Sequence, residues 1–328
     1  MAGDKIRERI QNMIDKVVSK LEEGVVPWRN KAADESGAHV LVCNPANAIS
    51  LHPYTGKNYF FTRIAVGLNG WSSGWFATYL QWKANDCTVK SGEKSTLIMK
   101  WYSNQVGVDP TTNQPIIEEG FRWFHVFNID QVQANGPTGT SFLGVNRNIV
   151  KNEVAWLRTH DNDGEDYYRV NMFDNLPDIL QFKFVETIQN QGDELKYDRQ
   201  TDTVIMPSMR NFSSAEAYYL TLFQGAVLAI GERMGRYRDR ENNSSLTARE
   251  FLVAEFASLY LMDRFGMQNA ETNGYVKYLP IWANYLKASE KNLMDVITDA
   301  TRSVKYILEK MEVISTKEEE EKAEQSDD

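Results

Sequence analysis

The segment from Tyr54 to Phe127 is rich in aromatic side chains, and this limits how it can fold. It holds 15 aromatic residues in 74 positions, about 20%, against 12% for the whole chain. Rings of this size bury large apolar areas, so many of them must lie in the core of a domain. Seven cations lie among them in the sequence: Lys57, Arg63, Lys83, Lys90, Lys94, Lys100 and Arg122. The segment therefore predicts a folded domain whose surface combines rings with positive charge.

Rings and cations together are typical of a groove for single-stranded nucleic acid, because bases offer π-faces and the backbone offers phosphates. Cations beside aromatic rings are also an ordinary feature of protein surfaces. The pattern alone leaves both interpretations open: a nucleic-acid surface, or an aromatic core with a charged exterior.

The net charge of −9 is unevenly distributed along the chain. Residues 1–145 carry 14 Lys and Arg against 13 Asp and Glu, a balance of +1. Residues 146–328 carry 22 against 32, a balance of −10, and seven of these acids lie in residues 317–328. The first part can therefore still bind a polyanion, since the acidity belongs to the second part.

Composition places the chain among soluble globular proteins. Its 328 residues suffice for two cores, and 42% of them are hydrophobic and 25% charged. No apolar stretch reaches the length of a membrane span, and the first residues lead into no signal-peptide core. Only Cys43 and Cys87 are present, too few for a disulfide framework or a thiolate zinc site. We expect a cytoplasmic protein.

Periodicity and turn residues predict the organisation. An amphipathic helix is expected over residues 4–23, and the Asn-Gly-Pro-Thr-Gly run at 135–139 is the best domain boundary. Before that boundary we expect a helix at 75–85, strands at 96–102 and 121–126, and a polar hairpin or insertion at 103–119. After it we expect helices at 146–159, 215–234, 247–265, 277–289 and 291–312. The predicted domains are therefore 1–145, 146–312 and a disordered acidic tail, 313–328.

Four sequence blocks in a fixed order resemble the N-terminal domain of the ArdC antirestriction proteins and of the related TraC-type plasmid primases. They are His-Pro-Tyr-Thr-Gly-Lys-Asn-Tyr at 52–59, Trp-Phe-Ala-Thr-Tyr-Leu-Gln-Trp at 75–82, Val-Lys-Ser-Gly-Glu-Lys-Ser-Thr at 89–96 and Val-Phe-Asn-Ile-Asp-Gln at 126–131. The resemblance covers roughly residues 5–135 and implies binding of single-stranded DNA. Where that family usually has Gly-x-Asn, this chain has Phe61-Thr62-Arg63, so we expect a differently shaped groove with Phe61 as an added stacking platform.

The second part resembles the zincin-like metallopeptidase domain of the same family, on ordered landmarks that include Tyr197, Asp202, Pro207 and Phe212. That domain carries His-Glu-x-x-His, in which two imidazoles hold zinc and the glutamate acts as general base. Here Gln224 and Leu228 occupy the histidine positions and Gly225 the glutamate position. The chain's four histidines lie elsewhere. We therefore expect no catalytic residues, no metal site and no enzymatic activity.

Glu255 matches the family's downstream glutamate ligand, within a largely apolar helix. Three interpretations stay open: a former ligand, a partner for a nearby arginine, or a solvent-facing acid. Pairing is favoured, because an unpaired buried carboxylate is costly.

Together these observations predict two α+β domains and a tail: an ArdC-like domain that binds single-stranded DNA, then a mostly helical, degenerate zincin-like domain. The expected function is non-catalytic binding of single-stranded DNA without a cofactor, in a protein of a phage or other mobile element inside a bacterial cell. The expected DNA contacts are stacking rings and phosphate-binding cations: Tyr54, Tyr59, Phe60, Trp75, Lys57, Arg63, Lys83, Lys90 and Lys94.

Two further expectations concern protein partners. The acidic tail or the second domain is predicted to dock a polymerase or another replication or transcription protein. The alternative function is an antirestriction inhibitor that acts by binding a host enzyme.

Overall fold

The structure, a computed structural model, describes residues 2–29, 45–145, 157–160, 166–187, 195–237, 248–267 and 275–326. It divides the chain into two compact units. We call Pro27–Val150 the aromatic unit, and Met1–Val26 together with Lys151–Asp328 the helical unit.

The first helix, α1 (Ala2–Glu22), belongs to the helical unit, whereas the sequence grouped it with the residues that follow. It packs against α9 (Leu279–Ala288), and its apolar stripe, with Ile14, Val17 and Leu21, is buried. An amphipathic helix must cover its apolar stripe, and chain order does not reveal which element covers it. The observed units also divide at residue 150 rather than 145.

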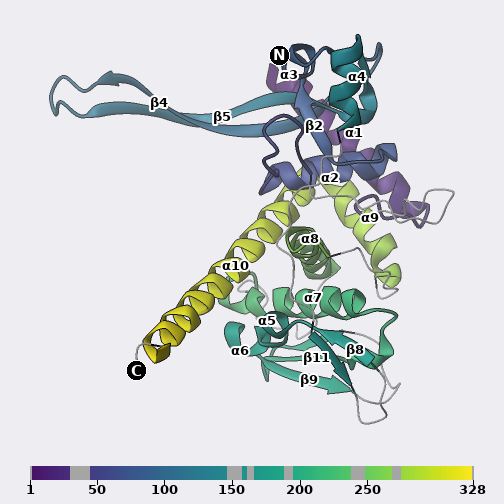
Figure 1. Cartoon of the computed structure of the whole chain (residues 1–328), viewed down its shortest axis with the longest axis vertical. Helices are drawn as coiled ribbons and strands as arrows, with labels where there is room; N and C mark the ends of the chain where they lie inside the picture. Colours follow the sequence, from purple (N-terminus) through teal and green to yellow (C-terminus); the bar gives the residue numbers. More distant parts are fainter. Residues whose placement is uncertain are drawn as a thin grey trace. The chain divides into compact units, whose positions relative to one another are not determined.

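The aromatic unit contains one mixed sheet and three helices (Figure 1). The strand order is β1-β2-β5-β4, in which β1 and β2 run parallel and the other neighbours run antiparallel. A second, two-stranded sheet pairs β3 with β6. The elements are β1 (Ala46–Asn47), α2 (Lys57–Asn69), β2 (Trp75–Thr78), α3 (Tyr79–Ala84), β3 (Cys87–Val89), β4 (Thr96–Val108), β5 (Pro115–Asn128), the 3₁₀ turn η1 (Ile129–Gln131), β6 (Val132–Ala134) and α4 (Pro137–Gly144).

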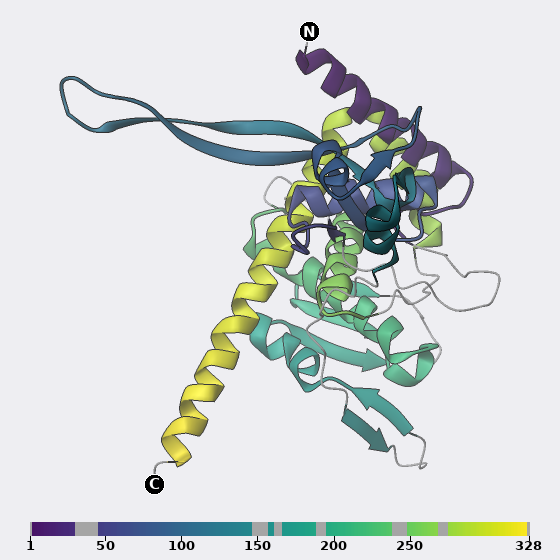
Figure 2. The same cartoon turned by 45° about the horizontal axis from the view of Figure 1, so that its top comes forward.

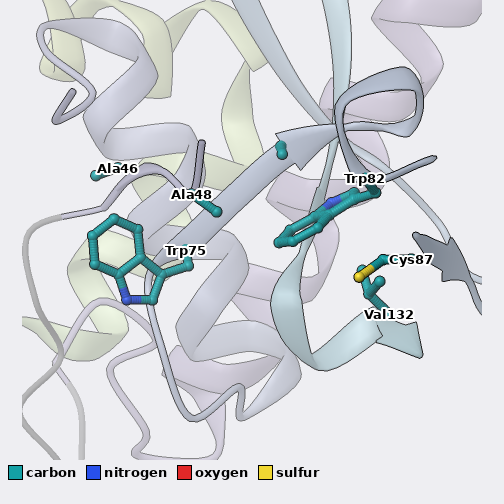
Figure 3. Packing of buried hydrophobic residues seen from close by; sticks show 7 residues of the cluster. Ala46, Ala48, Trp75, Trp82, Cys87 and Val132 are labelled. Atoms are coloured by element: carbon teal, nitrogen blue, oxygen red, sulfur yellow. The ribbon is translucent and has the colours of Figure 1, made fainter. Parts of the chain in front are cut away.

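Aromatic rings fill the core of this unit. Trp75 and Trp82 are buried with Ala46, Cys87 and Val132 in one cluster (Figure 3). The indole N–H of Trp82 donates to the backbone carbonyl of Phe127 at 3.1 Å, so this buried polar group is satisfied. Many of the aromatic rings between Tyr54 and Phe127 therefore lie in the core.

The helix predicted at 75–85 is wrong in its first third. Residues 75–78 form strand β2, and α3 begins only after Thr78. Thr78 caps this helix: its hydroxyl accepts from the N–H of Gln81, and the Gln81 side chain accepts from the N–H of Thr78. This reciprocal pair is a capping box, which fixes where the helix starts.

Strands β4 and β5 continue well beyond the sheet as a two-stranded arm, visible in Figures 1 and 2. The two strands pair from Thr96 opposite Val126 to Val108 opposite Pro115, with one register shift between Gln105 and Gly107. Of the two alternatives predicted at 103–119, a polar hairpin or an insertion, the structure has the hairpin. Antiparallel pairing requires only complementary backbone groups, so polar side chains on both faces did not prevent it.

The helical unit combines a three-stranded sheet, in the order β10-β11-β9, with a group of helices. Helix α7 packs on α8 and on β11, and α8 packs on α10. The elements not yet named are β7 (Leu157–His160), β8 (Asp166–Arg169), α5 (Asn171–Asp174), α6 (Leu176–Leu180), β9 (Lys183–Thr187), β10 (Lys196–Asp198), β11 (Thr203–Pro207), η2 (Met209–Asn211), α7 (Ala215–Arg233), α8 (Ala248–Arg264), η3 (Val276–Tyr278) and α10 (Glu290–Ser326).

Two sequence predictions for this unit need correction. A helix was expected at 146–159, but residues 157–160 form strand β7. The rest of the expected helix, residues 146–156, lies outside the described residues. The tail expected to be disordered from residue 313 instead continues α10 as far as Ser326. Glu, Lys and Ala are strong helix formers, and a helix already nucleated by packing extends at little cost. No helix in the described ranges is both long and apolar enough to cross a bilayer.

A buried ion-pair network joins three of these segments. The carboxylate of Glu250 is fully buried and accepts from Arg236 at 2.9 Å and from Arg249 at 2.6 Å. Arg249 also pairs with Asp299 of α10. Such a network stabilises the fold only when all its members are present, because removing one of them leaves an uncompensated buried charge.

We predict that Glu250→Ala lowers the free energy of unfolding by about 3–5 kcal/mol, because it strands two partly buried arginines. Urea unfolding followed by circular dichroism measures the change. Glu309→Ala is the matched control: Glu309 pairs with Lys305 at 3.6 Å on the surface, a contact worth about 0–1 kcal/mol. Equal losses in the two variants would contradict a structural role for the network.

Candidate nucleic-acid interface

Three of the four rings predicted to stack on bases lie in the core. Tyr59, Phe60 and Trp75 are buried, and Phe61, the expected added platform, is buried as well and lies 6.0 Å from the ring of Trp123. These assignments are corrected here, because a ring enclosed by protein has no face to offer to a base. The residues that looked like groove in the sequence are the core-facing side of α2 and of β2.

Tyr54 is half-buried and meets the ring of Phe76 edge-on, with the centroids 6.3 Å apart. Burial raises the pKa of its hydroxyl to about 12, an effect that the neighbouring Asn47 side chain partly offsets. Tyr54 therefore keeps its proton at neutral pH and presents only part of its ring.

Arg63 was predicted to contact phosphate, but it is also a core residue with 1% of its surface exposed. Its Nε donates to the backbone carbonyl of Trp28 at 3.1 Å. The chain at Pro27 and Trp28 lies directly on α2: a Cβ placed on Gly67 would come within 1.4 Å of the Pro27 carbonyl oxygen. Arg63 thus fastens this segment to the helix.

The other predicted cations are accessible. Lys83, Lys90 and Lys94 are exposed and Lys57 is half-buried. Two more exposed cations, Lys100 on β4 and Arg122 on β5, were not among the predicted contacts. Across the residues that the structure describes, none of these six cations forms an ion pair. In the helical unit, by contrast, five arginines pair with carboxylates: Arg169, Arg199, Arg233, Arg236 and Arg249. The aromatic unit therefore carries positive charge that its own carboxylates do not neutralise.

The base of the arm brings cations and rings onto one face. Lys100 and Arg122 lie directly opposite each other in the β4–β5 register. Phe124, with 37% of its surface exposed, follows on one side of this pair, and Tyr102 lies on the other. Like charges directly opposite each other in a sheet are unfavourable, so this pair favours an anion above it.

Tyr102 is held in place by its neighbours. The guanidinium of Arg122 lies 4.5 Å from the centre of its ring, and its hydroxyl bonds to Glu118 at 3.2 Å. The ring also lies across Gly120, where an added Cβ would come within 2.9 Å of the Tyr102 hydroxyl oxygen. Gly120 therefore makes room for the ring, which in turn orients Arg122.

Lys57 belongs to the same region, because its neighbour Asn58 is bonded to the outer edge of β4. The Asn58 amide donates to the Met99 carbonyl and accepts from the Met99 N–H, each at 2.7 Å. One side chain thus completes both backbone bonds of an edge residue. Lys57 and Lys100 are the residues adjacent in sequence to this pair.

Two other predicted cations share a turn. The ammonium of Lys90 donates to the carbonyl of Asp130 at 2.8 Å, and Gln131 donates to the carbonyl of Lys94 at 2.9 Å. The turn is thereby fastened to η1. Lys83 lies on a separate element, in the last turn of α3.

Sequence reasoning missed Lys100, Tyr102, Arg122 and Phe124 as a group. Alternation in the two predicted strands was the available signal, since residues two apart share a face. The register between the strands was still needed to show that the two cations meet.

Among the residues that the structure describes, no donor set equivalent to the metal site of a zincin is present. Gln224 on α7 donates to the carboxylate of Glu255 on α8 at 2.9 Å, and Glu255 is only 1% exposed, so it is not a solvent-facing acid. Leu228, one turn further along α7, is fully buried. At Gly225 a Cβ would come within 2.6 Å of a Val204 methyl group, so a larger residue here requires the Val204 side chain to shift. A catalytic zinc takes three protein ligands, and one amide plus one carboxylate do not fit it.

Two models of known protein families match successive parts of the chain. The model of the N-terminal domain of anti-restriction factor ArdC matches residues 7–127, and that of a zincin-like metallopeptidase matches residues 178–299. The chain therefore carries an ArdC-type N-terminal domain followed by a zincin-like domain. The resemblance inferred from ordered sequence blocks, and the expected α+β fold class, are thereby confirmed.

Solved structures of the antirestriction protein ArdC from the R388 plasmid share this fold. The metal-free structure superposes with a TM-score of 0.61 at 19% identity, over 92% of this chain and 97% of that one. The Mn(II)-bound structure gives a TM-score of 0.59 at 20% identity over the same shares.

Two curated relatives are 23% identical to this chain. DNA primase TraC of Escherichia coli aligns over 317 residues, 91% of this chain and 27% of TraC, so the chain spans about a quarter of that relative. The uncharacterised protein y4eC of Sinorhizobium fredii aligns over 303 residues, 90% of this chain and 89% of its own length.

We predict that Tyr59→Ala and Arg63→Ala lower the thermal midpoint, the first by an amount equivalent to about 3–5 kcal/mol, since each removes a core side chain. Lys57→Ala is the contrasting variant and should leave the midpoint unchanged. Differential scanning calorimetry measures all three. An unchanged thermal midpoint for Tyr59→Ala would contradict the placement of this ring in the core.

Proposed function

We propose that the aromatic unit binds single-stranded DNA, through the face at the base of the arm. The observation that carries this proposal is the Lys100–Arg122 pair, flanked on one face by Tyr102 and Phe124. Two adjacent cations suit backbone phosphates, and the exposed ring of Phe124 beside them suits an unstacked base, with the half-buried Tyr102 on the other side. The similar proteins, an antirestriction protein and a DNA primase, support a role on DNA.

The proposed surface extends to the remaining accessible cations. Lys57 adjoins the arm base, and Lys90 and Lys94 lie in the turn that leads into β4. A positively charged track without built-in carboxylate partners is typical of sequence-independent binding, because phosphates recur along every strand. A preference for single strands follows from the rings, which need unpaired bases.

We predict that Lys100→Ala with Arg122→Ala weakens single-stranded DNA binding and lowers the log–log salt slope by about 1.4, at about 0.7 per lost phosphate contact. Phe124→Ala should weaken binding by about 1–3 kcal/mol while leaving the slope nearly unchanged, because it removes stacking. Fluorescence anisotropy against a single strand, its duplex and the matching RNA, at several salt concentrations, measures both effects.

Lys196→Ala, an exposed cation on β10 of the helical unit, is the matched control and should change neither quantity. Equal affinity for duplex and single strand, or unchanged binding by the double variant, would sink the proposal. That result would favour the alternative, an antirestriction inhibitor that binds a host enzyme. A phage or mobile-element origin, a bacterial cytoplasmic location and a protein partner for the acidic end of α10 stay predictions.

We further propose that the helical unit is not a peptidase and serves as a scaffold. Support comes from the Gln224–Glu255 hydrogen bond, which uses the carboxylate that a metal would need, and from Gly225, which lacks a side chain and packs closely against Val204. Leu228 contributes no donor atom.

We predict that Gln224→His with Leu228→His creates a site for one divalent metal, because the new imidazoles lie one helical turn apart and face Glu255. Zn²⁺ titration by calorimetry, with circular dichroism to confirm folding, measures it. Adding Glu255→Gln to the double variant should weaken the site. Stoichiometric zinc in the unmodified protein, or proteolysis that a chelator abolishes, would contradict the scaffold role.

A further inference from the structure

Part of one edge of the β4–β5 arm has no neighbouring strand among the described residues. Strand β5 pairs with β4 along one edge, but β2 covers its other edge only from Val126 to Asn128. From Pro115 to His125 this second edge has no strand beside it among the described residues. Exposed N–H and C=O groups along such an edge are a template for another strand. The midpoint of the open stretch is Gly120.

The charges along β5 are arranged around the same midpoint. Glu118 and Arg122 lie two residues before and after Gly120, on one face of the strand, about 14 Å apart by strand geometry and too far to pair. Arg122 faces Lys100 across the hairpin, and Glu118 faces Asn104. Neither charge has an oppositely charged partner in the described part of the chain.

A second copy of β5, antiparallel and related by a twofold axis at Gly120, satisfies both charges. Glu118 then lies opposite Arg122 of the partner subunit, and the reciprocal pair forms by symmetry. Ile116, 46% exposed, comes opposite Phe124 of the partner subunit, which covers both. Moving the axis to residue 119 would place Glu119 opposite its own copy. Moving it to residue 121 would place Glu118 opposite a phenylalanine. The register centred on Gly120 is therefore the favoured one.

The lengths also agree. In this register Pro115 of the partner subunit reaches His125, the last residue before β2 takes over the edge. The open stretch is therefore filled from end to end. A two-stranded ribbon is marginal in water, and pairing two arms makes it four-stranded.

We propose that the chain forms a twofold dimer through the β5 edge of its arm, with a second copy as the partner. The pairing uses the edge of the arm and leaves both faces uncovered. Lys100, Tyr102 and Phe124 of the two copies then lie on one continuous face. The proposal rests on the edge and its charges, so it stands or falls independently of DNA binding.

Sedimentation velocity of the full chain without nucleic acid, over a concentration series, tests it. Glu118→Arg should raise the dimer dissociation constant about tenfold or more, because two attractive pairs become repulsive. Arg122→Glu should do the same. The doubly exchanged variant, Glu118→Arg with Arg122→Glu, should recover dimerisation, because both pairs re-form with reversed sign.

Glu119→Arg is the matched control, since it changes the net charge equally from the opposite face of the strand and should have little effect. A protein that is monomeric at every concentration, or an exchanged variant that stays as weak as the single ones, would overturn the proposal. So would an equal loss in the Glu119 variant. Any of these results combined with intact single-strand binding would leave the proposed function in place.

Discussion

The register between β4 and β5 is the constraint on which the functional surface depends. It sets Lys100 opposite Arg122 and Tyr102 opposite Gly120, an arrangement that costs the isolated fold some repulsion. The inner end of β4 is fixed by the Asn58 side chain, which bonds both backbone groups of Met99, and the inner end of β5 is fixed by β2. Both contacts act where the arm leaves the sheet, so the cation pair is positioned by the fold rather than by a loop.

The sequence predicted the fold class, but it did not separate core rings from exposed ones. Tyr59, Phe60 and Trp75 carry the same side chains as residues that stack on bases, and only their position on the inner side of α2 and β2 places them in the core. Arg63 was harder still, because a buried guanidinium bonded to the carbonyl of Trp28 has no signature in local sequence. The exposed pair required register, which depends on contacts between residues far apart in the chain.

The proposed loss of the metal from the helical unit has a physical account in the packing between α7 and α8. Two helices of a metalloenzyme fold must present polar ligands inside an apolar core, and removing a ligand would leave Glu255 buried and unsatisfied. The side-chain amide of Gln224 donates a hydrogen bond to the Glu255 carboxylate and so provides it with a partner. Gly225 and Leu228 then allow close packing, the first against Val204 and the second within the core. This close packing is what the proposed scaffold role requires.

Gly120 connects the two surfaces assigned to the arm. Its missing side chain lets the Tyr102 ring lie flat across β5, and that ring holds the Arg122 guanidinium over the face of the sheet. Arg122 from there can meet a phosphate above the face or Glu118 of the partner subunit along the edge. In the proposed dimer, Glu118 of the partner subunit and a DNA phosphate would compete for Arg122, so the two proposed equilibria would be linked at this residue.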